Sequence, residues 1–220
     1  MKYADDILSY LEMCSNEGCN LQRGMNYRLG GDHSIVLMST RPGAPYKDKI
    51  ESDGMVIIYE GHDQPRVALD SDPKRLDQLD KSEKGTLTQN GLFHQAAQQY
   101  KTGLRDAERV HVYEKIKKGI WAFNGVFELL DSAIESDGKR LVFRFKLGLV
   151  STVPVGDAVL NKLPDLSHTR LIPSRVKVEV WRRDQGKCVE CGAVDNLHFH
   201  SAVLPSRRRI FNCSVPGTTF

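Results

Sequence analysis

Short runs in the middle of the chain alternate apolar with polar residues or are largely apolar, which is typical of β-strands. Strands are predicted over 34–39, 55–59, 109–113, 121–130 and 140–150. Helices are predicted over Tyr3–Met13, over Gly91–Tyr100, and from Ser174, as the N-terminal cap, through Trp181. Several strands with turn-rich connections and few helices favour an α+β chain whose main part is a curled, barrel-like β domain.

Proline and charge mark the breaks between these elements. Residues 65–85 are polar, carry Pro73 and are too many for an ordinary connection, so a functional or mobile loop is predicted there. Residues 151–172 are proline-rich and predict a linker. The chain thus divides into an N-terminal helix and lead-in over 1–23, a β domain over 24–150, the linker, and a small segment over 173–220.

Composition narrows the classes of function. The chain has 220 residues, 40% of them hydrophobic, which is enough to bury a core. A mean hydropathy of −0.40 without a long apolar run excludes a membrane span, and the acidic start lacks a signal core, so a cytoplasmic protein is expected. The net charge of +3 is unevenly spread, because nine basic residues face four acidic ones from Arg170 onward, giving +5 there and −2 elsewhere. A near-neutral total is weak support for a nucleic-acid partner, and all of the net positive charge comes from the C-terminal part.

The five cysteines indicate a reducing compartment, because an odd number without a secretion signal argues against a disulfide framework. Cys188 and Cys191 form a C-x-x-C pair. Such a pair is either a redox couple or half of a structural zinc site. No thioredoxin-like βαβ pattern surrounds it, which favours the zinc half-site while both readings stay open.

Several motifs of the β domain follow one another in an order and at a spacing typical of one known domain family. They are Gly31–Ser39, Asp53–Asp63, Asp77-Gln78, Asn90-Gly91-Leu92, Arg109–Val112 and Trp121–Leu129. Their order and spacing resemble the SRA (SET and RING associated) domain over residues 24–149 or so. The resemblance implies that the domain binds double-stranded DNA containing 5-methylcytosine or 5-hydroxymethylcytosine and flips the modified base out of the duplex, at a cost of a few kcal/mol in unstacking.

The same resemblance implies a pocket for that base. The pocket needs an aromatic surface for stacking and an acceptor for the cytosine amino group. Tyr46, Asp48 and Tyr59 match the family's tyrosine–aspartate–tyrosine pattern, with one extra residue between the tyrosines compared with vertebrate members. Gly43 and Ala44 would let the backbone approach the base edge. Without the resemblance, Tyr46 beside a proline would be interpreted as turn packing, and Tyr59 at the end of an apolar strand as core.

Contacts to the DNA outside the pocket are also implied. The loop over 63–78 carries Arg66, Lys74 and Arg75, and by analogy it enters the duplex and fills the vacated space, whereas the alternative is a solvated charged loop. Asn90 is a further candidate for DNA contact. Two other polar residues, His62 and His94, are assigned structural roles.

The C-terminal segment resembles the first part of an HNH endonuclease. The matching stretches are Ile172–Asp184, Cys188–Gly192 and Asn196–Phe199. In that family a histidine is the general base, a divalent metal such as Mg²⁺ or Mn²⁺ acts on the phosphate, and four cysteines hold a structural zinc. Here the expected aspartate–histidine pair is replaced by His200 and Ser201, so no catalytic residue is assigned. Cys188 and Cys191 also lack their partner pair, which leaves at most half a zinc site.

A frameshift near Phe199–His200 explains this departure, because codons compatible with the last residues also permit an HNH-like ending in another frame; a naturally divergent tail is the alternative. We therefore expect a relative of bacterial modification-dependent SRA–HNH restriction endonucleases, which are phosphodiester hydrolases, that reads modified DNA but no longer cuts it. A homodimer is possible, since cutting both strands favours one. The alternative is a stand-alone DNA- or RNA-binding module without nuclease function.

Overall fold

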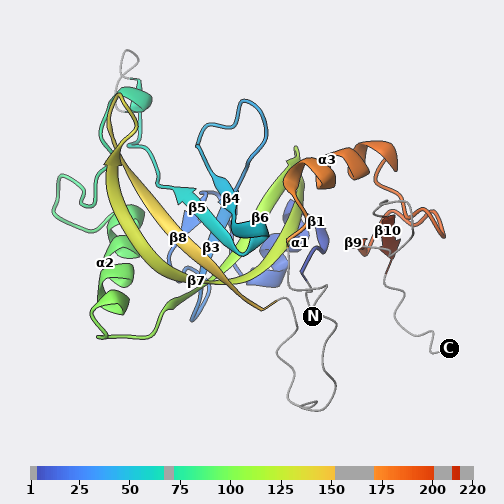
Figure 1. The fold of residues 1–220 in the computed structure, drawn as a ribbon, viewed down its shortest axis with the longest axis horizontal. Coiled ribbons are helices and arrows are strands. Elements are labelled where there is room, and N and C mark those ends of the chain that lie inside the picture. Colours follow the sequence, from blue (N-terminus) through green and yellow to red (C-terminus); the bar gives the residue numbers. More distant parts are fainter. Residues whose placement is uncertain (1–3, 67–71, 152–170, 201–209, 214–220) are drawn as a thin grey trace.

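One large, strongly curved sheet dominates the computed structural model, which describes residues 4–66, 72–151, 171–200 and 210–213 (Figure 1). The strand order is β2-β3-β6-β7-β8-β5-β4, and β1 pairs with β7. Only β3 and β6 run parallel, while the other pairs are antiparallel. The strands are β1 (Ile7–Ser9), β2 (Met25–Asn26), β3 (Ser34–Met38), β4 (Lys49–Glu51), β5 (Val56–Glu60), β6 (Glu108–Lys117), β7 (Ile120–Ser136) and β8 (Leu141–Ser151).

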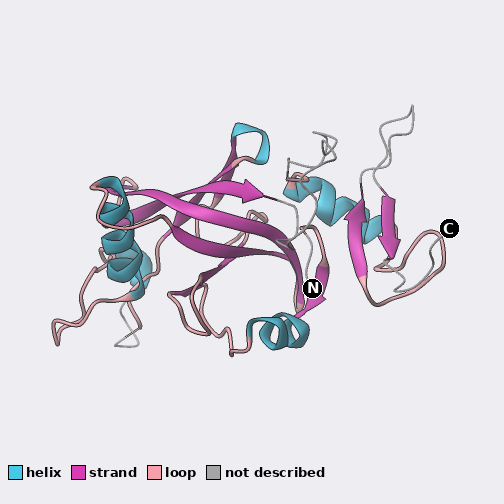
Figure 2. Ribbon diagram, turned by 90° about the horizontal axis from the view of Figure 1, so that it is seen from below, coloured by secondary structure: helices cyan, strands magenta, loops and turns pink. Residues whose placement is uncertain are grey.

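The helix α2 (Gln89–Lys101) covers one part of this sheet. Thr88 caps it, because the hydroxyl accepts a hydrogen bond from the backbone N–H of Gly91 at 3.2 Å. Its buried face presents Phe93, Ala96 and Ala97 to the main apolar cluster of the sheet. Figure 2 shows α2 at one end of the curved sheet and the C-terminal elements at the other.

The mixed α and β class is confirmed, and each predicted strand is found, with β6 and β7 extending well beyond the predicted bounds. The predicted barrel is not confirmed, since the strand order ends at β2 on one side and β4 on the other. The sheet is therefore curled and open in the part of the chain that the structure describes.

The predicted N-terminal helix over Tyr3–Met13 is wrong in its bounds. Ile7 and Leu8 belong to β1, which pairs with Ala122 and Trp121 of β7, and the helix α1 spans Tyr10–Glu17. Ser9 sets this start through a capping box: its hydroxyl accepts from the Glu12 N–H at 3.2 Å, and the Glu12 carboxylate accepts from the Ser9 N–H at 2.7 Å.

The C-terminal segment contains α3 (Ser174–Arg183) and a two-stranded antiparallel sheet of β9 (Leu197–His200) and β10 (Ile210–Cys213). Ser174 is the first helical residue and Pro173 occupies the cap position, so the predicted serine cap is wrong. Proline is favourable at a helix start because its fixed φ is compatible with the helix and it lacks an N–H that needs a partner. The short strand predicted over 197–200 is confirmed.

This segment packs onto the large sheet. An apolar cluster joins the two parts through the buried residues Ile7, Ile116, Ala122, Ile172, Val180, Cys188, Leu197 and Phe199. Lys177 of α3 is fully buried, and its ammonium contacts Asn124 Oδ1 at 2.6 Å, Asp5 Oδ1 at 3.0 Å and Glu114 Oε2 at 3.7 Å. A buried ammonium needs such partners to offset its lost hydration, so Lys177 fixes where α3 docks.

The start of the chain connects the two sheets. Asp5 donates its backbone N–H to Phe123 and accepts from the Phe199 N–H at 3.0 Å. Leu171 and Ile172, at the end of the predicted linker, are buried, whereas residues 152–170 of that linker lie outside the described part. Across the described ranges, no helix has the length and apolar character needed to cross a membrane.

Candidate functional site

Tyr46, Asp48 and Tyr59 come together where the loop before β4 crosses the end of β5. The Asp48 carboxylate accepts backbone N–H bonds from Ser39 at 3.0 Å and Glu60 at 3.1 Å, which fixes it between β3 and β5. Burial raises the pKa of Asp48 to about 6. Burial, followed by the charges of Asp48 and Tyr46, also raises the pKa of Tyr59 well above its ordinary value. The sequence-predicted trio is thus one electrostatic unit.

The three residues differ in exposure. Tyr59 is 1% exposed and belongs to the main core, so it forms the closed floor of the site. Tyr46 and Asp48 are half-buried. The Tyr46 ring lies nearly parallel to the His62 ring, with centroids 6.0 Å apart, and the Lys74 ammonium lies 3.9 Å from the Tyr46 centroid. The Tyr46 ring is therefore the aromatic surface that a ligand can reach.

His62, which sequence reasoning assigned a structural role, also lies at this site, and that assignment stays a prediction. Its ring lies beside Tyr46, and burial lowers the pKa of His62 to about 4, so the imidazole is neutral at pH 7. Gly24 closes over it: a Cβ on Gly24 would lie 2.8 Å from the Tyr59 hydroxyl oxygen and 2.9 Å from His62 Nε2. Only glycine fits there, and the glycine-rich approach to β3 was the signal available.

Asn90 positions this histidine. The Asn90 side chain accepts from the His62 N–H at 2.8 Å and donates to the His62 carbonyl at 2.9 Å. Gln78 holds the preceding residue by donating to the Gly61 carbonyl at 2.7 Å. Both amides are buried and fix the chain just after β5, while the predicted contact of Asn90 with DNA stays a prediction.

An ionic network supports the site from behind. The buried Arg140 guanidinium reaches Asp63 at 2.6 Å and Glu60 at 3.4 Å, and Arg144 reaches Glu60 at 2.9 Å. Lys74 completes the set by pairing with Asp63 at 2.7 Å. Glu60 also accepts the Lys47 backbone N–H at 2.9 Å, next to Asp48. Glu60 and Asp63 thus each pair with two of these three cations, which holds the loops around the site in place.

The predicted DNA-entering loop begins and ends on this network. Arg140 donates to the backbone carbonyls of Pro73 at 2.7 Å and Leu76 at 3.2 Å, at the short 3-10 helix η2 (Pro73–Arg75). Lys74 points to Tyr46, whereas the Arg75 side chain is 83% exposed and Arg66 is exposed. Residues 67–71 lie outside the described part.

Gly43 and Ala44 form a turn rather than a wall of the site. The Ala44 N–H donates to the Arg41 carbonyl at 3.0 Å, and Gly43 adopts a φ of 76°, which favours glycine. Gly43 is exposed, and a Cβ there would meet no atom within 4 Å. The turn carries the chain toward Tyr46, so its predicted approach to a base edge stays a prediction.

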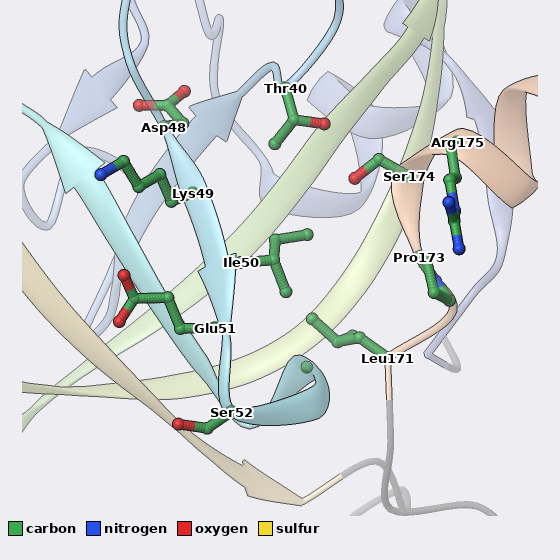
Figure 3. Close-up of a pocket in the computed structure, with 11 residues that line it drawn as sticks. Thr40, Asp48, Lys49, Ile50, Glu51, Ser52, Leu171, Pro173, Ser174 and Arg175 are labelled. Atoms are coloured by element: carbon green, nitrogen blue, oxygen red, sulfur yellow. The ribbon is translucent and has the colours of Figure 1, made fainter.

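A groove leads from Asp48 toward α3. Its volume is about 520 Å³, and Figure 3 shows Ile50 and Leu171 pointing into it from opposite sides, with Ser174 and Arg175 along the helix. A second hollow of about 630 Å³ continues past Thr40 and is lined by Arg41, Arg175 and Arg182. Arginines along a groove suit a phosphate backbone.

In the Cys188–Cys191 pair, Cys188 is buried and Cys191 is exposed. The Cys188 carbonyl accepts the Gly192 N–H at 2.9 Å and its N–H donates to Ala193 at 2.8 Å, so the pair sits on a tight turn. Within the described ranges, three side chains that could together bind a metal ion are found elsewhere in the fold, and neither cysteine belongs to that cluster. The zinc half-site stays a prediction, and Ser201 and the side chain of His200 lie outside the described residues.

No family model matches the chain, and no curated protein matches it either. Solved structures do match this chain. The SRA domain of SUVH5 in complex with fully methylated CG DNA has a TM-score of 0.46 and 18% identity, covering 70% of this chain and 92% of that one. The same domain bound to fully hydroxymethylated CG DNA has a TM-score of 0.40 and 20% identity, and the match covers 60% of this chain and 79% of that one. The DNA modification-dependent restriction endonuclease AspBHI has a TM-score of 0.49 and 14% identity, covering 82% of each chain. Structural neighbours of this chain thus include SRA domains and a modification-dependent endonuclease.

Proposed function

We propose that this chain binds double-stranded DNA containing a modified cytosine and takes the flipped base into the pocket of Tyr46, Asp48 and Tyr59. The observation that carries the proposal is the Asp48 carboxylate, half-buried and held by two backbone N–H groups beside both tyrosines. The sequence resemblance to SRA domains, read from the order of their motifs, supports the same assignment.

Each group has a chemical task in this proposal. The Tyr46 ring stacks on the base, which returns roughly 1–3 kcal/mol against the few kcal/mol that unstacking costs. The Asp48 carboxylate accepts from the exocyclic amino group, which cytosine has and thymine lacks. Lys74 now lies over a face of Tyr46, so a base that stacks on this face displaces the ammonium.

Binding to the rest of the duplex rests on scattered basic side chains. Arg66 and Arg75 are exposed on the loop beside the pocket, and Arg41, Arg175 and Arg182 line the hollow beyond it. Phosphate contacts of this kind set position and salt dependence, whereas the pocket sets the choice of base.

Cleavage is not part of the proposal. The sequence places His200 and Ser201 where an HNH nuclease carries its aspartate and histidine, so a general base for water is missing at that position. Incubation of methylated plasmid with Mg²⁺ or Mn²⁺ is expected to leave the DNA intact. Efficient cutting under these conditions would contradict this assignment.

The binding test uses matched duplexes that carry cytosine, 5-methylcytosine or 5-hydroxymethylcytosine at one position. The wild-type chain is expected to prefer a modified duplex, and Asp48→Asn is expected to weaken binding of that duplex about 5- to 150-fold, from roughly 1–3 kcal/mol per base-reading contact. Asp72→Asn, at an exposed carboxylate near the same loop, is the control and should leave the preference unchanged. Equal affinity for all three duplexes, or stronger competition by RNA, would overturn the proposal.

Base extraction is measured separately with 2-aminopurine placed next to the modified cytosine. Its fluorescence is expected to rise on binding, because the neighbouring base loses its stacking partner. The rise should be smaller with Tyr46→Ala at saturating protein, since that variant removes the exposed stacking surface. Saturated binding without any rise would show that the duplex is read without flipping.

A further inference from the structure

Three potential metal ligands converge at a place distinct from the pocket, where α1 meets β3 and β6. Glu17 is the last residue of α1, His33 precedes β3, and His111 lies in β6 opposite Ile35. One ligand atom from each of these side chains lies within 4.8 Å of the others. The three residues are far apart in sequence, so the parallel pairing of β3 with β6 and the packing of α1 bring them together.

The contacts within this cluster are close and directional. His33 Nε2 lies 2.8 Å from Glu17 Oε2, and His111 Nδ1 lies 3.0 Å from Glu17 Oε1. The two imidazole rings are 3.7 Å apart between centroids, with planes tilted by 32°. The Tyr113 hydroxyl donates a short hydrogen bond to the same carboxylate. The Glu17 side chain is fully buried, whereas His33 and His111 keep 24% and 16% exposure, which leaves a side open to water.

A positive charge next to the Glu17 carboxylate would stabilise it at this position. A buried carboxylate loses its hydration, and at the C-terminal end of a helix it also faces the negative end of the helix dipole. Gly18, in a left-handed conformation, ends α1 directly after it. A cation between the carboxylate and the two imidazoles offsets both costs at once.

We propose that Glu17, His33 Nε2 and His111 Nδ1 bind a divalent transition-metal ion of the zinc type, with water in a fourth position. Two imidazoles and one carboxylate are a common ligand set for Zn²⁺, which takes these ligands at about 2.0–2.2 Å in tetrahedral geometry. That geometry separates neighbouring ligand atoms by roughly 3.3–3.5 Å. Glu17 Oε2 lies 2.8 Å from His33 Nε2 and 3.3 Å from His111 Nδ1, so only the first separation needs to widen, by about half an ångström.

A neighbouring carboxylate already orients one ligand. Asp32 Oδ1 lies 3.2 Å from His33 Nδ1, on the other nitrogen of the ring. This contact lets Nδ1 keep its proton, so that Nε2 can give its lone pair to a metal ion in place of the hydrogen bond that it now makes with Glu17. Such carboxylate–histidine–metal arrangements fix the ring and raise its basicity. The Tyr113 hydroxyl holds the Glu17 carboxylate in the same manner.

The consequence is a metal clip between the N-terminal helix and the sheet. The site uses none of the base-pocket residues, and it is also separate from the Cys188–Cys191 pair. Its expected effect is on stability, because an ion that binds the folded chain and not the unfolded chain raises the midpoint of unfolding.

The test uses the full chain, stripped with EDTA and titrated with Zn²⁺ and with Co²⁺. The wild type is expected to bind one ion at this cluster, with a visible Co²⁺ spectrum typical of tetrahedral coordination, and Zn²⁺ should raise its melting temperature. His33→Ala and His111→Ala are each expected to weaken this binding at least 10-fold and to abolish the thermal shift. His94→Ala, a histidine bonded to Ser132 elsewhere in the fold, is the matched control and should behave as the wild type.

The cysteines provide the second comparison. Cys188→Ser with Cys191→Ser is expected to leave this ion bound, and the Co²⁺ spectrum should lack the intense near-ultraviolet band of thiolate coordination. The proposal is overturned if neither histidine variant changes the metal affinity, or if the cysteine variants remove all binding. These readouts need no DNA, so they stand or fall independently of the proposed reading of modified bases.

Discussion

Two buried acidic clusters in the same sheet are balanced in different ways. Beside the proposed base pocket, Glu60 and Asp63 meet the guanidinium groups of Arg140 and Arg144 and the ammonium of Lys74. Beside α1, the fully buried carboxylate of Glu17 meets two imidazoles and a tyrosine hydroxyl. The first cluster is balanced by two guanidinium groups and an ammonium, whereas the second meets two imidazoles, which are also metal ligands, and a hydroxyl.

The difference separates a fixed frame from an exchangeable site. Guanidinium groups do not lose their protons in proteins, so the pocket cluster keeps one arrangement and can hold the loops around Tyr46 and Asp48. Imidazoles can exchange a proton for a metal ion. The comparison therefore predicts that removing a cation beside the pocket costs more stability than removing the carboxylate beside α1.

The largest effect is expected from Arg140→Met. The variant leaves Glu60 and Asp63 buried with less compensating charge and removes the hydrogen bonds to the loop carbonyls, which should cost about 3–5 kcal/mol of unfolding free energy. Urea unfolding followed by circular dichroism measures it. Arg75→Met, at an 83% exposed arginine, is the control and should stay within about 0.5 kcal/mol of the wild type. Equal losses in the two variants would refute the idea of a fixed ionic frame.

The next effect depends on pH. Burial raises the pKa of Asp48 to about 6 in the folded chain, above the value near 3.9 of an unfolded aspartate. Between these values the folded chain holds a proton that the unfolded chain has lost. The contribution of Asp48 to the free energy of unfolding therefore falls as pH rises from about 4 to about 6, by up to about 3 kcal/mol, and levels off above.

Asp48→Asn cannot titrate and should lack this fall. The measurement is urea unfolding of both proteins between pH 4 and pH 8, and the quantity is the difference between their curves. Parallel curves would show that Asp48 is not perturbed by burial. The same ionisation predicts that affinity for modified DNA rises as pH increases through about 6, because the carboxylate then accepts from the base.

A smaller effect is expected from Glu17→Gln in metal-free protein. The amide can still accept hydrogen bonds from the Tyr113 hydroxyl and from a neutral imidazole, so the loss should be about 1–2 kcal/mol. Urea unfolding in EDTA at pH 7.5 measures it beside Arg140→Met. A loss as large as that of Arg140→Met would show that the two clusters are equally rigid and would remove the contrast between them.

The smallest effect is expected on the affinity for DNA, from the exposed Arg75 on the loop beside the proposed pocket. Arg75→Ala should weaken binding to modified and unmodified duplexes alike and reduce the slope of log affinity against log salt by about 1. Filter binding between 50 and 200 mM NaCl gives both values. A loss confined to modified DNA would place Arg75 in base recognition instead.

Part of the fold could be predicted from the sequence because the local pattern of apolar residues agrees with their burial in the folded chain. The alternation at 109–113 matches β6, and the apolar spacing within 91–100 matches the buried face of α2. Tyr46, Asp48 and Tyr59 were predicted as pocket residues from the order of motifs, since three polar residues spread over a loop and a strand carry no periodic signal. The N-terminal error shows the limit: Ile7 and Leu8 suit a helix or a strand, and pairing with β7 decided between them.

The sequence by itself determined where strands and helices form, because side-chain periodicity and capping act over a few neighbouring residues. It also determined the residue types available for reading a base. Only the tertiary structure decided that His62 lies beside Tyr46 and that the Asn90 side chain is hydrogen-bonded to the His62 backbone. It also decided that Glu17, His33 and His111 share one cluster. These outcomes depend on strand pairing and burial between residues many positions apart, and such contacts set charge, exposure and pKa in ways that no local pattern encodes.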